Sequence, residues 1–277
     1  MKKTWLLILV IALLSNTAPL YAKSAGSIEA DELNYNMNTK QASAVGNVVF
    51  TRGLDVLKGS RAEGIVDEQI TVTGSPVRGD FVSRKAALTA AKVVWSADKK
   101  MKNSDNIAAF GNVHLRQGQK NFLSAPEVKV NTGRKIYEAV GGIEALYNNI
   151  YIKALEVFRD SENFRGNKVI KLEDRVKKYT LSAGTITGKI SEKDEISSAV
   201  AEHDVVFGYT DKEGIKSRLY GDKAVYNRAP GELVVTGNAH GIREDGKTVK
   251  ADKLTYNEKT GQIEASGNTK ITFVTEK

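Results

Sequence analysis

One stretch near the C-terminal end of the chain decides the fold: VKADKLTYN at residues 249–257, EKTG at 258–261, and QIEASGNTKITF at 262–273. In its second half, apolar or small residues alternate with polar ones. A period of two is the pattern of a β-strand that is buried on one face. The turn formers Asn257 and Gly261 lie between the two strand patterns. The stretch therefore predicts two antiparallel strands joined by a short turn.

The same stretch recurs along the chain. IEADELNYN at 28–36 leads through a turn into QASAVGNVVF at 41–50, and LYGDKAVYN at 219–227 is followed by LVVTGN at 233–238. Weaker copies fill the interval, and a fixed period of this kind indicates a repeat protein. Eight two-strand units follow, each marked by a small residue about 30 residues after the last: Ala30, Gly59, Ala90, Ala125, Ala154, Ala183, Gly221 and Ala251.

Two features of the unit predict its geometry. The marker residue and the next apolar residue, such as Ala251 and Leu254, are three apart, which puts them on opposite faces unless a bulge absorbs one residue. We therefore expect bulges at Asp31-Glu32 and Asp252-Lys253. A Gly-Asn pair within the second strand marks a bend. A bend in every unit would crease the sheet into two facing halves with an apolar interior. The clear copies of the repeat carry the pair at residues 46–47, 111–112, 237–238 and 267–268.

These patterns predict an all-β fold, an elongated antiparallel β-jelly roll or twisted two-leaf sandwich of about 16 strands built from repeated two-strand units. We expect a single domain over residues 23–277, with units that are degenerate around 150–205. The pattern leaves little room for helices after the N-terminal region. Two open sheet edges remain, and such edges invite strand addition.

Residues 1–22 predict a signal peptide. Lys2 and Lys3 precede the apolar run 5–14, which is shorter than the roughly 20 residues of a membrane span, and Ala22 offers a small residue for cleavage. An uncleaved membrane anchor is the alternative. Export through a cleaved N-terminal signal would place the protein outside the cytoplasm.

Composition excludes several classes of protein. The chain has no Cys, which excludes a disulfide-stapled scaffold and a thiolate metal site, and 41% hydrophobic residues are too many for a wholly disordered chain. The net charge of +8 falls to +6 without the two signal lysines, and no cluster of five or more Lys and Arg occurs. We therefore expect no nucleic acid partner.

The sequence predicts no enzyme, metal site or cofactor. It has no phosphate-binding loop, nucleophile elbow or zinc-ligand spacing. The aspartates that follow the marker residues recur at one place in the repeat, and the expected bulge explains them better than acid–base chemistry does. The three histidines are too scattered to suggest a metal site: His114, His203 and His240.

The repeated unit, Ala-Asp-x-Leu-x-Tyr-Asn followed by a turn and Ala-x-Gly-Asn-Val, resembles the repeat of the LptA/OstA-like family of periplasmic lipopolysaccharide-transport proteins. The strongest matches are 30–36 with 44–48 and 251–257 with 265–268, and the resemblance spans about residues 28–273. It implies a twisted β-jelly roll in the periplasm whose apolar interior shields the acyl chains of lipopolysaccharide. It leaves open whether the chain resembles the soluble bridge or the membrane-anchored relative of that pathway.

The resemblance also implies partners. These are lipopolysaccharide, through the acyl chains of its lipid A, and the inner- and outer-membrane components of the export machinery. Members of the family are expected to join end to end, strand to strand, into a homo-oligomer that bridges the two membranes during outer-membrane assembly. Association with membrane complexes follows from these partners.

The candidate lipid-binding residues are the inward apolar side chains of the repeat. Ordinary core packing is the competing explanation for each of them, because every sandwich needs inward apolar residues. The candidates are Leu33, Tyr35, Val48, Phe50, Val93, Trp95, Val113, Leu115, Val128, Val130, Leu254, Tyr256, Ile271 and Phe273.

Three functions remain open from the residues alone. A lipid carrier is physically sensible, because each acyl methylene exposed to water costs about 0.8 kcal/mol and an apolar trough removes that cost. A structural or adhesive β-repeat protein of the cell envelope would have the same strands around a packed interior and would not transport lipid. An envelope hydrolase acting on carbohydrate would need a pair of carboxylates facing one cleft.

Overall fold

The computed structural model describes residues 26–101, 104–191 and 196–273. The signal peptide predicted at 1–22 lies outside the described residues. The chain divides into two compact units. We call described residues 26–148 and 158–161 the N-terminal unit, and described residues 149–157 and 162–273 the C-terminal unit.

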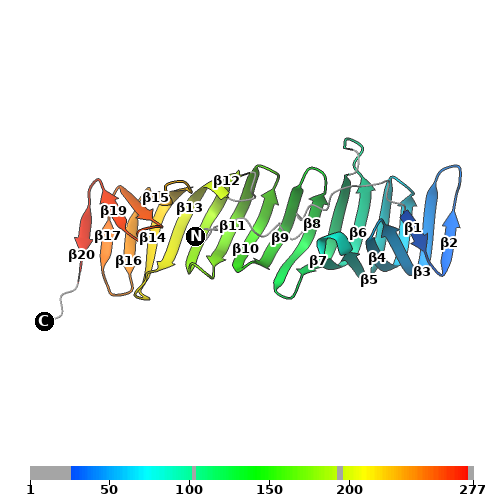
Figure 1. Ribbon diagram of the computed structural model, residues 1–277, viewed down its shortest axis with the longest axis horizontal. Helices are drawn as coiled ribbons and strands as arrows, with labels where there is room; N and C mark the ends of the chain where they lie inside the picture. Colours follow the sequence, from blue (N-terminus) through cyan, green and yellow to red (C-terminus); the bar gives the residue numbers. More distant parts are fainter. Residues whose placement is uncertain (1–25, 102–103, 192–195, 274–277) are drawn as a thin grey trace. The chain divides into compact units, whose positions relative to one another are not determined.

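The N-terminal unit is an antiparallel sheet in which β1 and β2 both pair with β3, and consecutive strands pair from β3 to β9 (Figure 1). A short 3₁₀ helix, η2 (Val82–Arg84), lies between the fifth and sixth strands. The strands are β1 (Gly26–Glu29), β2 (Glu32–Tyr35), β3 (Gln41–Arg52), β4 (Asp55–Ile65), β5 (Gln69–Phe81), β6 (Ala86–Ala97), β7 (Asp105–Gln117), β8 (Asn121–Asn131) and β9 (Ile136–Tyr147).

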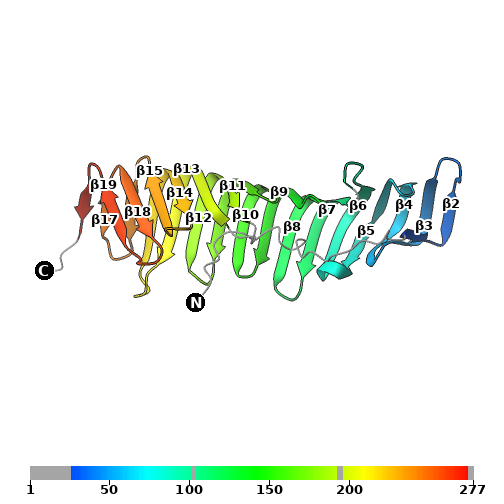
Figure 2. The same cartoon turned by 45° about the horizontal axis from the view of Figure 1, so that its top comes forward.

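The C-terminal unit follows the same plan, and its neighbouring strands lie side by side with tight turns between them (Figure 2). β10 (Ile150–Arg159) begins in this unit, and its last two residues are assigned to the N-terminal unit. The other strands are β11 (Asn163–Asp174), β12 (Tyr179–Ile190), β13 (Ile196–Thr210), β14 (Lys216–Asn227), β15 (Glu232–Thr236), β16 (His240–Arg243), β17 (Thr248–Lys250), β18 (Lys253–Asn257), β19 (Ile263–Ser266) and β20 (Lys270–Thr272).

Each unit is creased across its strands, as the repeat predicts. One half of β14 pairs with β15 and the other half with β16, so the sheet splits into two halves at Gly221 and Asp222. The long strands of the N-terminal unit shift register at the matching place, for example between Val45 and Val48 of β3. We call the two halves leaf A and leaf B. In the N-terminal unit, leaf A contains β1 and leaf B contains β2. In the C-terminal unit, leaf A contains β16, β17 and β20, and leaf B contains β15, β18 and β19.

The backbone at the crease explains the Gly-Asn pair and the repeated aspartate. Gly237 and Asn238 both have positive φ, +72° and +54°. The Asp222 N–H donates to the Gly237 carbonyl at 2.8 Å, and the Asp222 carboxylate accepts a hydrogen bond from the Asn238 amide at 3.0 Å. The same two bonds join Asp31 to 46–47 and Asp252 to 267–268.

The predicted position of the bulge is wrong in one respect. We expected the irregularity at Asp31-Glu32, whereas the first strand breaks one residue earlier, at Ala30 and Asp31, and the extra residue lies in the partner strand. Two residues of the first strand face three of the second, Gly46 to Val48. The same offset occurs at Asp252. The reason is conformational, since Gly and Asn adopt positive φ at the lowest cost and so take the bulge.

The strand count agrees with the repeat once the crease is considered. The described residues contain 20 strands. In four places the crease separates one expected strand into two, giving the pairs β1 and β2, β15 and β16, β17 and β18, and β19 and β20. Counting each pair as one gives the predicted 16. The antiparallel all-β fold is therefore confirmed.

The degenerate copies keep the crease with other residues at positive φ. Near Ala183, β13 shifts register at His203 and Asp204, whose φ values are +67° and +53°. Near Ala154, Lys168 has φ +45° and the register of β11 shifts shortly after it. The bend is thus a property of the position in the sheet, and other residues accept its strain.

Within each unit the two leaves face each other across an apolar interior. In the N-terminal unit, the Phe50 ring of leaf A lies 5.7 Å from the Trp95 ring of leaf B. In the C-terminal unit, Tyr209 of leaf A and Tyr256 of leaf B have ring centroids 4.6 Å apart. The two leaves are joined along the crease by the backbone of the long strands. The side opposite the crease, where only side chains connect the leaves, is called the mouth. No helix of the described residues is long and apolar enough to cross a membrane.

The geometry of the crease predicts how much glycine-to-alanine substitutions lower the stability of the fold. An alanine at Gly237 would adopt positive φ and would place its Cβ 2.5 Å from Asp222 Oδ2, whereas an alanine at Gly261 would have the same φ sign and open space. Gly261→Ala should lower the free energy of unfolding by about 1–2 kcal/mol for the backbone strain alone. Gly237→Ala should cost about 1–3 kcal/mol more because of the collision. Denaturant unfolding measures both, and equal losses would contradict the packing of aspartate on the bulge.

Candidate functional site

The N-terminal unit contains a hollow beside β1 and β2. The space open to the centre of a water molecule is about 170 Å³. The lining is mainly apolar and comes from both leaves: Ile28, Leu33, Tyr35, Phe50, Ile70 and Trp95.

Charged side chains lie at the mouth of this unit. The Arg52 guanidinium of leaf A lies 4.7 Å from the centre of the Trp95 ring and 3.8 Å from the Asp105 carboxylate of leaf B. Within leaf A, Arg84 pairs with Asp55 at 3.6 Å. Burial raises the pKa of Asp55 and of Asp105, and the adjacent arginines oppose that rise. The mouth is therefore polar while the interior behind it is apolar.

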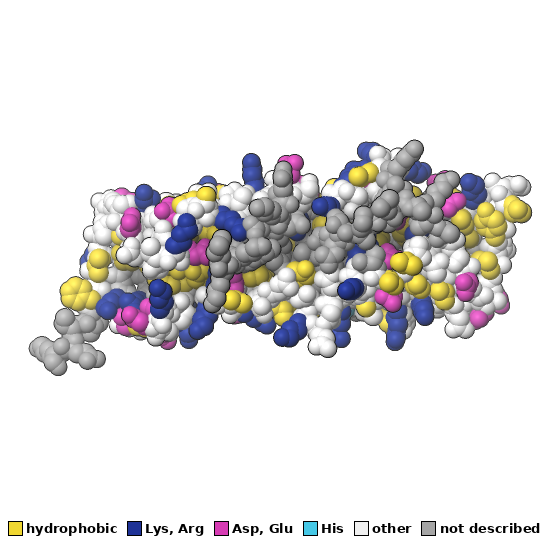
Figure 3. Space-filling view, viewed as in Figure 1, with side chains coloured by type: hydrophobic (Ala, Val, Ile, Leu, Met, Phe, Trp, Pro, Cys, Tyr) yellow, Lys and Arg dark blue, Asp and Glu magenta, His cyan; other side chains and the backbone are white. Residues whose placement is uncertain are grey.

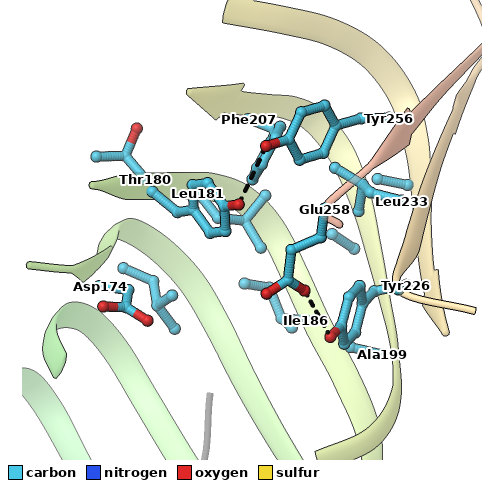
Figure 4. A pocket seen from close by; sticks show the side chains of 15 residues that line it. Asp174, Thr180, Leu181, Ile186, Ala199, Phe207, Tyr226, Leu233, Tyr256 and Glu258 are labelled. Carbon is cyan, nitrogen blue, oxygen red and sulfur yellow. Dashed lines mark hydrogen bonds between the residues drawn. The ribbon is translucent and has the colours of Figure 1, made fainter. Parts of the chain in front are cut away.

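The C-terminal unit contains a second, smaller hollow (Figure 4). The space open to the centre of a water molecule is about 40 Å³, against about 170 Å³ in the N-terminal unit. Side chains from both leaves point into it. The apolar part of the lining includes Leu181, Ile186, Ala199, Phe207, Leu233 and Tyr256.

An aromatic cluster narrows the second hollow. The Tyr256 ring of leaf B lies 6.1 Å from Tyr179, 5.4 Å from Phe207 and 4.6 Å from Tyr209, all of leaf A. The Tyr179 and Tyr256 hydroxyls share a hydrogen bond of 3.0 Å across the gap. Aromatic contacts of this kind stabilise the closed arrangement beyond the area that they bury.

An ion pair crosses the mouth beside this cluster. Lys177, in the turn between β11 and β12, pairs with Glu258, in the turn after β18. The Tyr226 hydroxyl donates to Glu258 Oε2 at 3.1 Å (Figure 4). The side chains of Lys177 and Glu258 are only 18% and 11% exposed. We call the Lys177–Glu258 pair together with the Tyr179–Tyr256 hydrogen bond the mouth contact.

Comparison with known proteins identifies the family. Residues 27–94 and 93–262 match the family described as LptA/(LptD N-terminal domain) LPS transport protein, and together these segments cover most of the chain. The chain belongs to this family. No curated protein matches the chain.

The chain also matches a solved structure. It is the crystal structure of LptH, described as the LptA-homologous periplasmic component of the conserved lipopolysaccharide transport device from Pseudomonas aeruginosa. It is 12% identical, and the match covers 91% of this chain and 96% of that chain. The TM-score of this match is 0.21.

The structure places most of the predicted lipid-binding residues of this LptA-family chain in the interior. Leu33, Tyr35, Phe50 and Trp95 line the larger hollow, and Tyr256 lines the smaller one. Four candidates on β2, on β20 or just after β20 are exposed: Leu33, Tyr35, Ile271 and Phe273. The other ten are buried: Val48, Phe50, Val93, Trp95, Val113, Leu115, Val128, Val130, Leu254 and Tyr256. Because core packing also buries such residues, their role in lipid binding stays a prediction.

Sequence reasoning missed most of the second hollow. Tyr179 was not among the candidates because it lies in the degenerate copies around 150–205. Phe207 and Leu233 lie outside that region and were also not among the candidates. The partners of the mouth contact are also 77 and 81 residues apart in the chain. A usable signal existed in the concentration of aromatic residues at 179, 207, 209, 226 and 256.

The three histidines have different neighbours and do not form a cluster. His114 Nδ1 lies 2.6 Å from the Ser124 hydroxyl, His203 lies in the bulge of β13, and His240 stacks on Tyr220 with ring centroids 4.7 Å apart. Within the part of the chain that the structure describes, no group of three or more His, Asp or Glu is placed to hold a metal ion.

The tyrosines of the second hollow give a prediction about pH. Burial raises the pKa of Tyr179, Tyr226 and Tyr256 above the usual tyrosine value, and Glu258 adds to the rise at Tyr226. Unfolded tyrosines ionise near pH 10. The unfolded chain therefore loses these protons first, and the free energy of unfolding should fall as pH rises above about 10.

Phenolate absorbance during an alkaline titration measures this. The three tyrosines should ionise only together with unfolding, and Tyr256→Phe should remove one late-titrating group. Ionisation of all tyrosines near pH 10 in a folded chain would contradict the closed mouth contact.

Proposed function

We propose that this chain is a periplasmic carrier of lipopolysaccharide that shields the acyl chains between its two leaves and bridges the inner and outer membranes. The observation that carries the proposal is the apolar hollow of about 170 Å³ in the N-terminal unit, lined from both leaves and open beside the free edge strands. Membership of a family described by lipopolysaccharide transport supports it.

The physical basis is the removal of acyl chains from water. Each methylene moved into an apolar interior gains about 0.8 kcal/mol, so a chain of a dozen carbons gains several kcal/mol without any chemical step. Repeated units offer similar surroundings at successive positions, which permits stepwise movement. The proposed activity is therefore non-enzymatic and needs no cofactor. Export by the signal at 1–22 would deliver the chain to the periplasm.

Lipid capture at Tyr35 tests the carrier proposal. Tyr35 lines the hollow and is 46% exposed, and Val45 of the paired strand β3 is 45% exposed but does not line it. A photoreactive benzoylphenylalanine at residue 35 should form a covalent adduct with lipopolysaccharide on illumination, and the same group at 45 should not. Mass spectrometry of the adduct measures this. Equal capture at both positions, or none at 35, would leave a structural β-repeat protein as the better explanation.

The open edges support end-to-end joining of copies. Among the described strands, β1 and β2 pair only with β3, and β20 pairs only with β17. Hydrophobic side chains are exposed over β2 and over β20 (Figure 3). They include Leu33, Tyr35 and Met37 at one edge and Ile271 and Phe273 at the other. Unpaired strand edges with apolar side chains favour strand addition, in this case by a second copy of the chain.

A charge at the edge should shorten such oligomers. Ile271 on β20 is 64% exposed, and Ile170 on β11 is 63% exposed but lies away from both edges. Ile271→Lys should shift the distribution toward the monomer, because an edge lysine opposes strand pairing. Ile170→Lys is the matched control and should not. Size-exclusion chromatography with light scattering measures both, and unchanged oligomers in Ile271→Lys would refute joining through β20.

A further inference from the structure

The hollow of the C-terminal unit is narrower than the hollow of the N-terminal unit. The space open to the centre of a water molecule is about 40 Å³, against about 170 Å³. Aromatic rings from the two leaves meet beside it, with the centroids of Tyr209 and Tyr256 4.6 Å apart. An acyl chain that entered between these rings would have to push the two leaves apart.

The leaves can separate at only one side. At the crease they are joined by the continuous backbone of β12, β13 and β14. At the mouth they are joined by side chains, namely the mouth contact and the ring contacts of Tyr256. Side-chain contacts break without loss of backbone pairing, so opening at the mouth keeps both leaves intact.

The mouth contact is built from groups that favour water once they are separated. Lys177 and Glu258 lose hydration when paired and regain it when parted, which offsets part of the cost of breaking the pair. The aromatic rings beside them gain no comparable hydration when they are exposed to water. Acyl methylenes that enter between the leaves would cover those rings, and the open state is therefore stabilised by the lipid and not by water.

The N-terminal unit repeats this arrangement with different residues. Arg52 of leaf A reaches Asp105 of leaf B at its mouth, and Arg52 also lies over the Trp95 ring. In both units a cation from leaf A meets a carboxylate from leaf B beside an aromatic side chain of the hollow. The recurrence shows that the C-terminal pair is not an isolated surface contact.

We propose that the Lys177–Glu258 pair and the Tyr179–Tyr256 hydrogen bond hold the hollow of the C-terminal unit closed at the mouth until the acyl chains of lipopolysaccharide part its leaves. This inference rests on the proposed function, and it adds a closed state and the contact that maintains it. The competing explanation is a permanent clip that only stabilises a packed sandwich.

Charge reversal distinguishes the two explanations. A benzoylphenylalanine replaces Phe207, which lines this hollow, and purified lipopolysaccharide is the probe. Glu258→Lys or Lys177→Glu should raise the initial rate of photo-capture at 207 by about fivefold or more, because like charges part the leaves. Combining the two reversals restores an opposite-charge pair and should return the rate toward that of the unaltered chain.

An exposed ion pair of the same unit provides the control. Lys223 and Glu202 pair at 2.8 Å on the outer surface, where both are more than 40% exposed. Glu202→Lys should leave capture at 207 unchanged. The same variants carrying the photoreactive group at Tyr35 report the N-terminal hollow, and capture there should not change with Glu258.

A covalent closure guards against misfolding of the reversal variants. The chain has no native cysteine, so Lys177→Cys with Glu258→Cys can be joined after folding by a short bis-maleimide linker. The linked protein should capture lipopolysaccharide at 207 at least about tenfold more slowly than the unlinked one. Equal rates would overturn closure by the mouth contact.

The outcomes separate this inference from the proposed function. Capture at 35 with none at 207 in any variant would overturn control of this hollow by the mouth contact and leave the carrier proposal standing. Capture at 207 that ignores both charge reversal and linking would also overturn the role of the mouth contact. Capture at neither position would overturn the carrier proposal and this inference together.

Discussion

The structure depends on one constraint, an extra residue that the second strand of each two-strand repeat must accommodate at the crease. An antiparallel ladder pairs residues one to one, so an extra residue forces the backbone out of the regular strand conformation. Gly237 and Asn238 accept this with positive φ, and Asp222 satisfies both the Gly237 carbonyl and the Asn238 amide. Without the crease, the apolar face of each sheet would remain open to water. With it, that face folds onto itself and becomes an interior.

The crease also determines where the interior can be reached. The backbone of the long strands continues through it, so the two leaves of each unit are joined covalently on that side and only by side chains at the mouth. The two units use this freedom differently. Phe50 and Trp95 leave a hollow of about 170 Å³ behind Arg52, whereas Tyr256 with Tyr179, Phe207 and Tyr209 reduces the other to about 40 Å³. The same repeat thus yields an open and a nearly closed interior by substitution of a few rings.

The sequence predicted what is local and repeated, and failed where neighbours in space decide. Alternation placed Val48, Val93 and Leu254 in the interior, because a strand buried on one face has period two. It could not show that the extra residue belongs to the Gly-Asn strand, because an offset of three is compatible with a bulge on either strand. It treated Leu33 and Ile271 like the rest, although both are exposed since no further strand covers them. Lys177 and Glu258 meet only because the sheet is creased, and no local pattern contains that pairing.

The polarity of the mouths then has a physical meaning. Well-packed apolar side chains would hold two leaves together at least as well as a partly buried ion pair does, because the pair loses hydration when it forms. A mouth closed by apolar residues alone would, once open, expose surface that binds any apolar partner. Lys177 with Glu258, and Arg52 with Asp105, keep the rim wettable in both states while the rings behind them remain apolar. An amphiphile with acyl chains inside and a polar head in water matches this division, whereas a wholly apolar or wholly polar ligand would match only half of it.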